Sequence, residues 1–412
     1  MKKSIALLAF FTQAALAQQN ETVTINPGYT HQVFYSMDNG TVVTPVNTDW
    51  DLAFQISGFE ASILVNSKNN VRLFNADREA SEWNQITPLD TIGYLNSSNE
   101  LFNSDTSWRR GAFNQTNNPA DQFDLGWGNY DFATHIVTGD SLYYIRLANG
   151  QVKKLQIINL ANGAYNFRFA DTDGSNEVTA SLSKSAFQGK LFGYYSIVNQ
   201  TTLDREPLKN DFDLVFTQYL AVFPLTYKVT GVLQNDSVPA IKVYPVDVAA
   251  ATTNGQNYSY HINTIGYDWK AFDLNNNQWV IEDSLVYFLK DRSGNYWKLW
   301  FTGFGGSANG NFHFTKEQVT PLNISEPQSL NIISVYPNPA NDLLNLIVDG
   351  MNAAAIQLII ADMSGRKVQE QTLTNHAGWN HHQINLKKLT GGMYSVQLIS
   401  EGYITMLKVM KE

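Results

Sequence analysis

The five residues Trp50-Asp51-Leu52-Ala53-Phe54 recur once in the chain, as Phe212-Asp213-Leu214-Val215-Phe216. An aromatic-Ser segment stands upstream of each copy, Phe34-Tyr35-Ser36 before the first and Tyr194-Tyr195-Ser196 before the second. Two motifs that recur in the same order and so far apart indicate a tandem duplication. The duplication then decides how the residues between the two copies are interpreted.

The recurring pentapeptide is expected to form a buried β-strand. Its aromatic, Leu and Phe side chains alternate with an acid and a small residue, and a period of two is typical of a half-buried strand. Asp51 and Asp213 stand at the strand starts, so we expect their carboxylates to accept hydrogen bonds from loop backbone. A catalytic carboxylate is the alternative.

Short apolar runs broken by Asn, Gly, Asp and Pro follow, and they have the length of β-strands. Residues 141–147 and 152–158 flank Asn149-Gly150, a strong hairpin signal because both turn residues accept positive φ. Helical periodicity is scarce, and residues 78–84 are a candidate for a short helix. Residues 93–129 are rich in Asn, Ser and Trp and are expected to form a long surface excursion.

The second half repeats these landmarks in the same order, so each repeat is expected to be a β-meander that ends on an aromatic-x-Phe strand. The sequence leaves open whether the two sheets form separate domains or share one core. The corresponding pairs are residues 141–146 and 284–289, residues 150–157 and 294–301, and residues 161–167 and 308–314.

The composition favours an all-β protein that works outside the cell. Only 16% of the 412 residues are charged, 13% are aromatic, and Asn is abundant. The formal net charge of −9 argues against nucleic acid or an anionic membrane as a partner, since either would attract a basic patch. The chain has no cysteine, which excludes disulfides, thiolate catalysis, Cys-ligated metals and a lipidated N-terminal Cys.

The first residues have the pattern of a secretory signal peptide. Met1-Lys2-Lys3 is basic, an apolar run extends from Ile5 to Leu16, and Ala15-Leu16-Ala17 is a small-x-small cleavage site. No later segment reaches the ~18–20 apolar residues that a membrane span requires. We therefore expect an exported mature chain without a transmembrane segment.

Three motifs resemble the HmuY family. They are Tyr194-Tyr195-Ser196, the Asp-Phe-Asp-Leu-Val-Phe-Thr segment at 211–217, and Gly294-Asn295-Tyr296-Trp297-Lys298-Leu299. This resemblance covers both repeats and implies an all-β cell-surface protein that binds a ligand and is not an enzyme; some members of the family capture haem. The family's founding members are lipoproteins with an N-terminal Cys, so this chain must be anchored differently.

The C-terminal segment resembles the type A sorting domain of type IX secretion. The resemblance rests on Tyr336-Pro337-Asn338-Pro339, Asp362-x-x-Gly365-Arg366, Leu389-x-x-Gly392-x-Tyr394 and the basic tail at 408–411. It implies a small β-sandwich that engages the type IX secretion machinery and delivers the protein to the cell surface or the exterior.

We thus predict five segments: a signal peptide (1–17), a first HmuY-like repeat (18–187), a second (188–322), a linker (323–329) and the sorting domain (330–412).

Haem held by two axial side chains is what the HmuY resemblance implies. Four histidines precede the sorting domain: His31, His135, His261 and His313. His135 and His261 are the candidate haem ligands, because both fall just before the central hairpin of their repeat. A lone histidine near a strand is more often an ordinary surface or core residue, and that alternative stays open for both.

Two further patterns have alternative explanations. Asp171-Thr172-Asp173-Gly174 and the residues after it place oxygen ligands as a calcium loop does, but the terminal acid is missing and a hairpin turn needs the same residues. Trp83, Trp108 and Trp127 could stack on a flat ligand or belong to the core. No catalytic motif is present, so we expect neither catalytic residues nor a metal site.

These observations predict an exported binding protein of the HmuY type. Its expected partners are the type IX secretion machinery and haem or a haem protein, with His135 and His261 as the haem-binding residues. The alternative function is a structural or adhesive surface protein that has kept the fold and lost haem binding.

Overall fold

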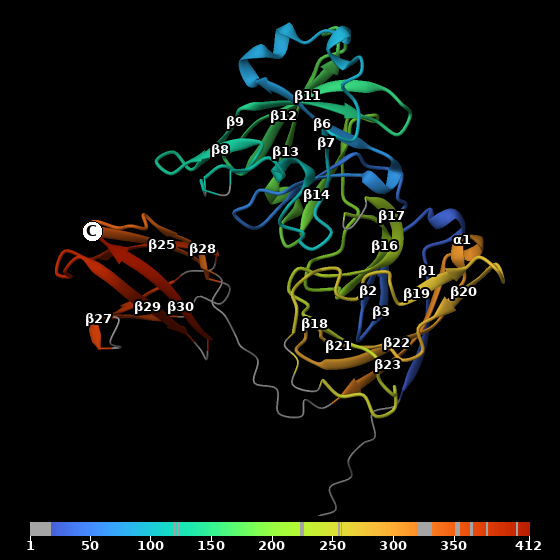
Figure 1. Ribbon diagram of the computed structural model, residues 1–412. Helices are drawn as coiled ribbons and strands as arrows, with labels where there is room; N and C mark the ends of the chain where they lie inside the picture. Colours follow the sequence, from blue (N-terminus) through green and yellow to red (C-terminus); the bar gives the residue numbers. More distant parts are fainter. Residues whose placement is uncertain are drawn as a thin grey trace, which may run out of the picture. The chain divides into compact units, whose positions relative to one another are not determined.

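The computed structural model describes residues 18–319 except 119, 122, 223–225, 254, 255 and 257, and residues 332–412 except 351–354, 363–365, 376, 377, 401 and 402 (Figure 1). The chain forms two compact units, residues 1–322 and 323–412. The predicted signal peptide (1–17) and linker (323–329) lie outside the described residues. Within the described residues, no helix is long and apolar enough to cross a bilayer.

The first unit is built almost entirely from strands, which confirms the predicted all-β class. Two four-stranded sheets stand at its centre: the first central sheet (β15-β14-β4-β5) and the second central sheet (β17-β16-β2-β3). Their strands are β2 (Val33–Ser36), β3 (Gly40–Val43), β4 (Leu52–Gln55), β5 (Ile63–Val65), β14 (Phe192–Ser196), β15 (Thr201–Leu203), β16 (Leu214–Ala221) and β17 (Tyr227–Gln234).

Larger sheets flank the central ones (Figure 1). The eight-stranded sheet contains β6 (Arg72–Glu79), β7 (Glu100–Leu101), β8 (Gly128–Asp131), β9 (Ile136–Gly139), β10 (Ser141–Arg146), β11 (Val152–Ala161), β12 (Ala164–Asp171) and β13 (Val178–Ser183). The five-stranded sheet contains β1 (Gln19–Thr24), β18 (Ala240–Val243), β21 (Val286–Lys290), β22 (Tyr296–Phe304) and β23 (Asn311–Val319), and β19 (Lys270–Asp273) pairs with β20 (Gln278–Ile281).

The helical elements of the described residues are short. They are α1 (Gly306–Asn309) and the 3-10 turns η1 (Pro27–Tyr29), η2 (Ser67–Asn69), η3 (Ala80–Gln85), η4 (Pro88–Thr91), η5 (Ala112–Asn114) and η6 (Lys184–Phe187). The short helix expected over residues 78–84 is therefore wrong in type and extent, because strand β6 continues to Glu79 and a 3-10 turn follows it.

The two halves of the first unit exchange strands. β4, which carries the first pentapeptide, pairs antiparallel with β14 from the second aromatic-Ser segment. β16, which carries the second pentapeptide, pairs with β2 from the first aromatic-Ser segment. The strands thus pair across the predicted division between residues 187 and 188, while the tandem duplication itself stays a prediction.

The two pentapeptide carboxylates secure this exchange. Asp213 accepts hydrogen bonds from the backbone N–H groups of Met37 and Arg292, both at 2.7 Å. Asp51 accepts one from the backbone N–H of Ile197 at 2.7 Å. Both acids are buried, and desolvation raises the pKa of each carboxyl even though the backbone donors act in the opposite direction. The structural role expected for these acids is confirmed.

Both faces of the central strands are covered. All four residues of β4 are buried: Leu52 and Phe54 face the core of the first half, whereas Ala53 packs in a cluster that holds Phe34 and Val215 of the second central sheet. The buried strand expected for the first pentapeptide is therefore confirmed, and the second central sheet covers the face that alternation alone would leave exposed.

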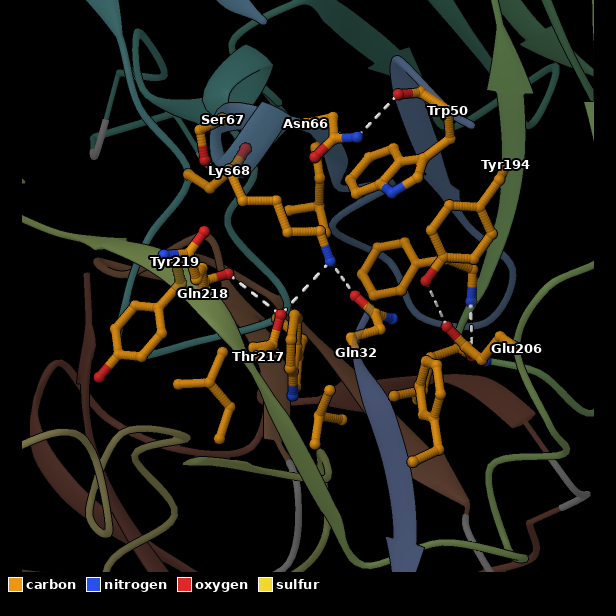
Figure 2. Close-up of a pocket in the computed structure, with 18 of the residues that line it drawn as sticks. Gln32, Trp50, Asn66, Ser67, Lys68, Tyr194, Glu206, Thr217, Gln218 and Tyr219 are labelled. Carbon is orange, nitrogen blue, oxygen red and sulfur yellow. Dashed lines mark hydrogen bonds between the residues drawn. The ribbon is translucent and has the colours of Figure 1, made fainter. Parts of the chain in front are cut away.

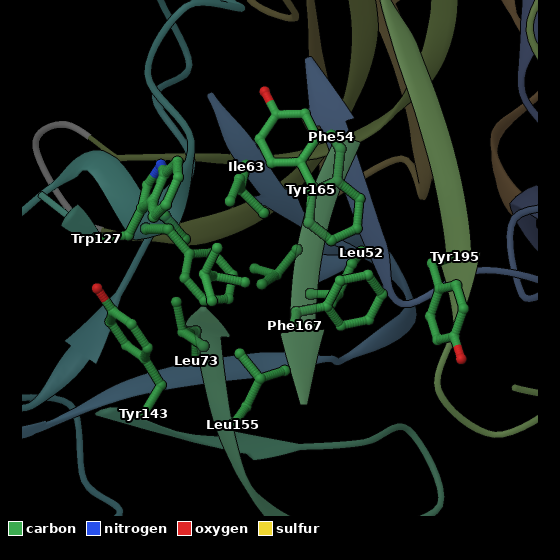
Figure 3. Packing of buried hydrophobic residues seen from close by; sticks show 14 of the residues in the cluster. Leu52, Phe54, Ile63, Leu73, Trp127, Tyr143, Leu155, Tyr165, Phe167 and Tyr195 are labelled. Carbon is green, nitrogen blue, oxygen red and sulfur yellow. The ribbon is translucent and has the colours of Figure 1, made fainter. Parts of the chain in front are cut away.

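The cores of the two halves contain the same arrangement of rings. In the first core, Phe54 stacks on Phe167 with ring centroids 5.0 Å apart, and Tyr195 meets Phe167 edge-on (Figure 3). In the second core, Phe216 stacks on Phe314 at 5.6 Å and Tyr35 meets Phe314 edge-on. The tyrosine of each trio belongs to the strand that the other half supplies, so neither core is complete without the exchange.

Three loop predictions can be compared with the structure. The surface excursion expected over residues 93–129 is only partly right, because Phe113 and Trp127 are fully buried in the first core. The Asp171 carboxylate accepts hydrogen bonds from Lys153 and Asn176 within the turn between β12 and β13, as the hairpin-turn alternative requires. The Asn149-Gly150 hairpin joins β10 to β11 as predicted.

The second unit is a β-sandwich, as predicted. One sheet contains β24 (Ile332–Tyr336), β25 (Leu343–Gly350) and β28 (Gly378–Asn385), and the other contains β26 (Ile356–Asp362), β27 (Lys367–Leu373), β29 (Gly392–Ser400) and β30 (Tyr403–Lys411). Alternating residues of both sheets, among them Leu346 and Leu358, form its hydrophobic core.

The exchange of strands makes a prediction about stability. Replacing Asp213→Ala leaves the buried amide of Met37 without its acceptor and should lower the free energy of unfolding by about 2–4 kcal/mol. Asp211→Ala is the matched control, because this neighbouring acid is exposed. Denaturant unfolding followed by tryptophan fluorescence measures both. Equal stability of the two variants would refute the role assigned to Asp213.

Candidate functional site

His135 lies in the turn between β8 and β9, where its backbone has a φ of 58°. The turn is fixed by Asp131, whose carbonyl accepts the His135 N–H at 2.8 Å and whose carboxylate accepts the N–H of Ala133. The His135 ring is exposed, and its Nδ1 lies 2.6 Å from the Tyr130 hydroxyl. Phe132 lies edge-on at 5.9 Å. The tyrosine therefore orients the imidazole and leaves Nε2 as the nitrogen for a ligand.

His261 lies in the segment between β18 and β19. Its N–H donates to Ser259 Oγ at 3.1 Å, and its carbonyl accepts from the side chains of Gln234 and Thr264. The ring itself is exposed, beside the exposed Tyr260. The backbone is thus held in place while the imidazole extends outward.

The two candidate histidines have separate surroundings. His135 lies in the turn between β8 and β9, and His261 lies in the segment between β18 and β19. Of the other two histidines, His31 bonds to Asn26, and His313 on β23 bonds to Thr22. Each of the four histidines therefore lies on its own loop or strand, and the assignment of His135 and His261 as ligands stays a prediction.

A pocket lies between the two central sheets (Figure 2). Its walls come from strands of both sheets, from the loop that carries Trp108 and from the residues before β14, and its free volume is about 80 Å³. The lining residues are Gln32, Phe34, Trp50, Leu64, Val65, Asn66, Ser67, Lys68, Asn103, Trp108, Leu191, Phe192, Tyr194, Glu206, Phe212, Val215, Thr217, Gln218, Tyr219 and Leu233.

Lys68 extends from η2 into this pocket. Its ammonium donates to Gln32 Oε1, lies 3.4 Å from Thr217 Oγ1 and stands 5.6 Å from the centre of the Trp50 ring. The residue as a whole is only partly buried, but its nitrogen points inward (Figure 2). Desolvation lowers the pKa of the Lys68 ammonium well below its usual value, and the nearby Arg205 lowers it further.

Glu206 is the second charged group of the lining. Its carboxylate accepts hydrogen bonds from the backbone of Leu191 at 2.7 Å and Phe192 at 3.2 Å, and from the Tyr194 hydroxyl at 2.7 Å. Desolvation nevertheless raises the pKa of Glu206 to about 7, because burial outweighs these donors and the nearby Arg205.

The Trp50 indole is buried beside Lys68, and its Nε1–H has no hydrogen-bond partner among the described residues. The sequence did not reveal this pocket, because its residues come from distant segments and each is unremarkable alone. Among the lining residues, Trp108 is the one that the sequence suggests for stacking on a ligand. The other two candidates for stacking, Trp83 and Trp127, are core residues.

The fold defines an all-β protein of several sheets, with a pocket between the two central ones. The HmuY protein model matches residues 28–316, which is more than half of the chain, so the chain belongs to the HmuY family. No curated protein matches it.

The second unit is identified in the same way. The model of the secretion system C-terminal sorting domain matches residues 334–412, which confirms the predicted sorting domain of type IX secretion. The protein is therefore exported, and it acts at the cell surface or outside the cell.

The buried glutamate predicts a pH dependence of stability. The folded pKa of Glu206, about 7, lies above its ordinary value of 4.5, so its contribution is full below pH 4.5 and is lost as the pH rises through 7. Relative to Glu206→Gln, the wild-type chain should lose about 3 kcal/mol of unfolding free energy over this range. Urea titrations at pH 4.5, 6 and 8 test this, and a constant difference between the two proteins would contradict it.

The sorting domain makes a prediction about location. Deleting residues 323–412 removes the second unit as a whole and should leave the protein in the periplasm. Cell fractionation and protease treatment of intact cells measure the outcome, with the full chain as control. Surface delivery of the truncated chain at the wild-type level would contradict the assignment.

Proposed function

We propose that this protein captures haem at the cell surface with His135 as an axial ligand. The family resemblance supports haem as the ligand, because some HmuY proteins capture it. The single observation that favours His135 is the 2.6 Å contact between its Nδ1 and the Tyr130 hydroxyl, on an exposed hairpin. Histidines that ligate metals usually engage their second ring nitrogen in such a hydrogen bond, which fixes the orientation of the ring.

The surroundings of His135 suit a flat apolar ligand. Phe132 is 38% exposed, and its ring lies beside the imidazole. Tyr130 stacks with Phe123 in the same hairpin region. A porphyrin bound through Nε2 would lie against these rings and remove apolar surface from water. His261, which is exposed on its own loop, is the candidate for a second axial ligand.

A structural or adhesive surface protein is the second candidate function. It is favoured by the separate surroundings of His135 and His261, since a protein that no longer binds haem has no need to bring them together. Secretion and fold are the same under both proposals, so haem binding alone distinguishes them.

Haem titration of the full chain tests the proposal. The wild-type chain should develop a Soret band distinct from that of free haem, and His135→Ala should abolish it. Tyr130→Phe should weaken binding by about 10–100-fold, because the ring loses its orienting partner. His313→Ala is the matched control, since this histidine is bonded to Thr22 on a strand.

His261→Ala then assigns the second ligand. Loss of the band in this variant identifies His261 as the other axial ligand, whereas its retention leaves His135 as the histidine ligand. A wild-type spectrum equal to that of free haem, or one unchanged in His135→Ala, would leave the structural or adhesive function in place.

A further inference from the structure

The pocket between the two central sheets holds the side-chain nitrogen of Lys68, which shares its nearest acid with another cation. The acid that acts on Lys68 is Asp49, and Asp49 forms its ion pair with Arg205 at 3.1 Å. An ammonium has three N–H donors, and Gln32 and Thr217 provide acceptors for two of them. One N–H donor is thus left for a ligand, and a bound anion would favour the charged form of Lys68, which burial disfavours.

A second donor beside it is also unused. The Trp50 side chain is 6% exposed, and its Nε1–H has no partner in the described part of the chain. Buried N–H groups in proteins are almost always hydrogen-bonded, so an unpaired one calls for an explanation. Because the Lys68 nitrogen lies 5.6 Å from the centre of the same ring, one acceptor group could engage both donors.

The remaining walls select an apolar body of limited size. Phe34, Phe192 and Leu64 contribute buried hydrocarbon from three different strands. The free volume of about 80 Å³ corresponds to roughly five to eight water positions. A porphyrin is far too large for this space, whereas a short-chain acid fits it. Glu206 also lines the pocket, and its charge disfavours a ligand with a second negative charge.

We propose that this pocket binds a small monocarboxylate with an apolar body. The carboxylate would accept from the Lys68 ammonium and the Trp50 indole N–H, and the hydrocarbon part would lie against Phe34 and Phe192. A single bound anion would thereby neutralise the buried charge and satisfy the buried donor. Ser67 and Gln218 of the lining are only partly buried, so the pocket is not sealed from solvent. His135 is not part of this lining, so the site is independent of haem capture.

Calorimetric titration of the full chain with pentanoate and pentanamide tests the proposal. The two probes have the same size and differ in charge, so pentanoate should bind at least about tenfold more tightly. Lys68→Met should abolish this preference while leaving any weak pentanamide binding unchanged. Lys242→Met is the matched control, because this lysine forms an exposed ion pair with Asp268 on another sheet.

Trp50→Phe provides the second variant. It keeps an aromatic ring but removes the unpaired N–H, and it should lower the affinity for pentanoate more than that for pentanamide. This variant decides the question if circular dichroism shows that Lys68→Met does not fold. Equal binding of the two probes by the wild-type chain, absence of pentanoate binding, or full pentanoate preference in either variant that folds would overturn the proposal.

Discussion

Each pentapeptide carboxylate binds backbone N–H groups of a segment that the other half of the chain supplies, and the first unit depends on this reciprocal interaction. Asp213 holds the end of β2 through Met37, and Asp51 holds the end of β14 through Ile197. A buried carboxylate needs strong donors to offset its desolvation, and the turn after each aromatic-Ser strand supplies them. The two acids thus hold in place the ends of the two strands that pair across the halves.

The exchange explains where the pocket lies. Because β4 and β16 each pair with a strand of the other half, the two central sheets face each other over a layer of aromatic side chains. Strands covered on both faces have no solvent side, so polar groups that enter this layer are buried. The carboxylate of Glu206 and the side-chain nitrogen of Lys68 are such groups. Desolvation raises the pKa of Glu206 and lowers the pKa of Lys68, because it disfavours the charged form of each.

The sequence predicted the elements of this fold better than their pairing. Its landmarks identified strands in matching order, and the aromatic trios around Phe167 and Phe314 occupy matching places in the two cores. Alternation within a strand is the same whether its partner is near or distant in sequence, so the exchange left no local signal. The burial of the pentapeptide strand is predicted correctly, but alternation does not identify the sheet that covers its second face.

The candidate sites differ in how far the sequence predicts them. The position of His135 before a central hairpin predicts it as a candidate ligand. Its contact with Tyr130 was not predicted, because it depends on a turn in which His135 has a positive φ. Gln32, Lys68 and Thr217 are ordinary polar residues in the sequence, and they meet because the sheets bring three distant segments together. Such a site is a property of the tertiary fold and not of a motif.

The two ends of the first unit lie side by side, because β1 (Gln19–Thr24) pairs along its whole length with β23 (Asn311–Val319). The first strand after the predicted cleavage site therefore has no partner until the last strand of the unit has been made. Contacts that close so long a loop form late and slowly. The five-stranded sheet therefore acquires its edge strand β1 only when almost all of the first unit is present.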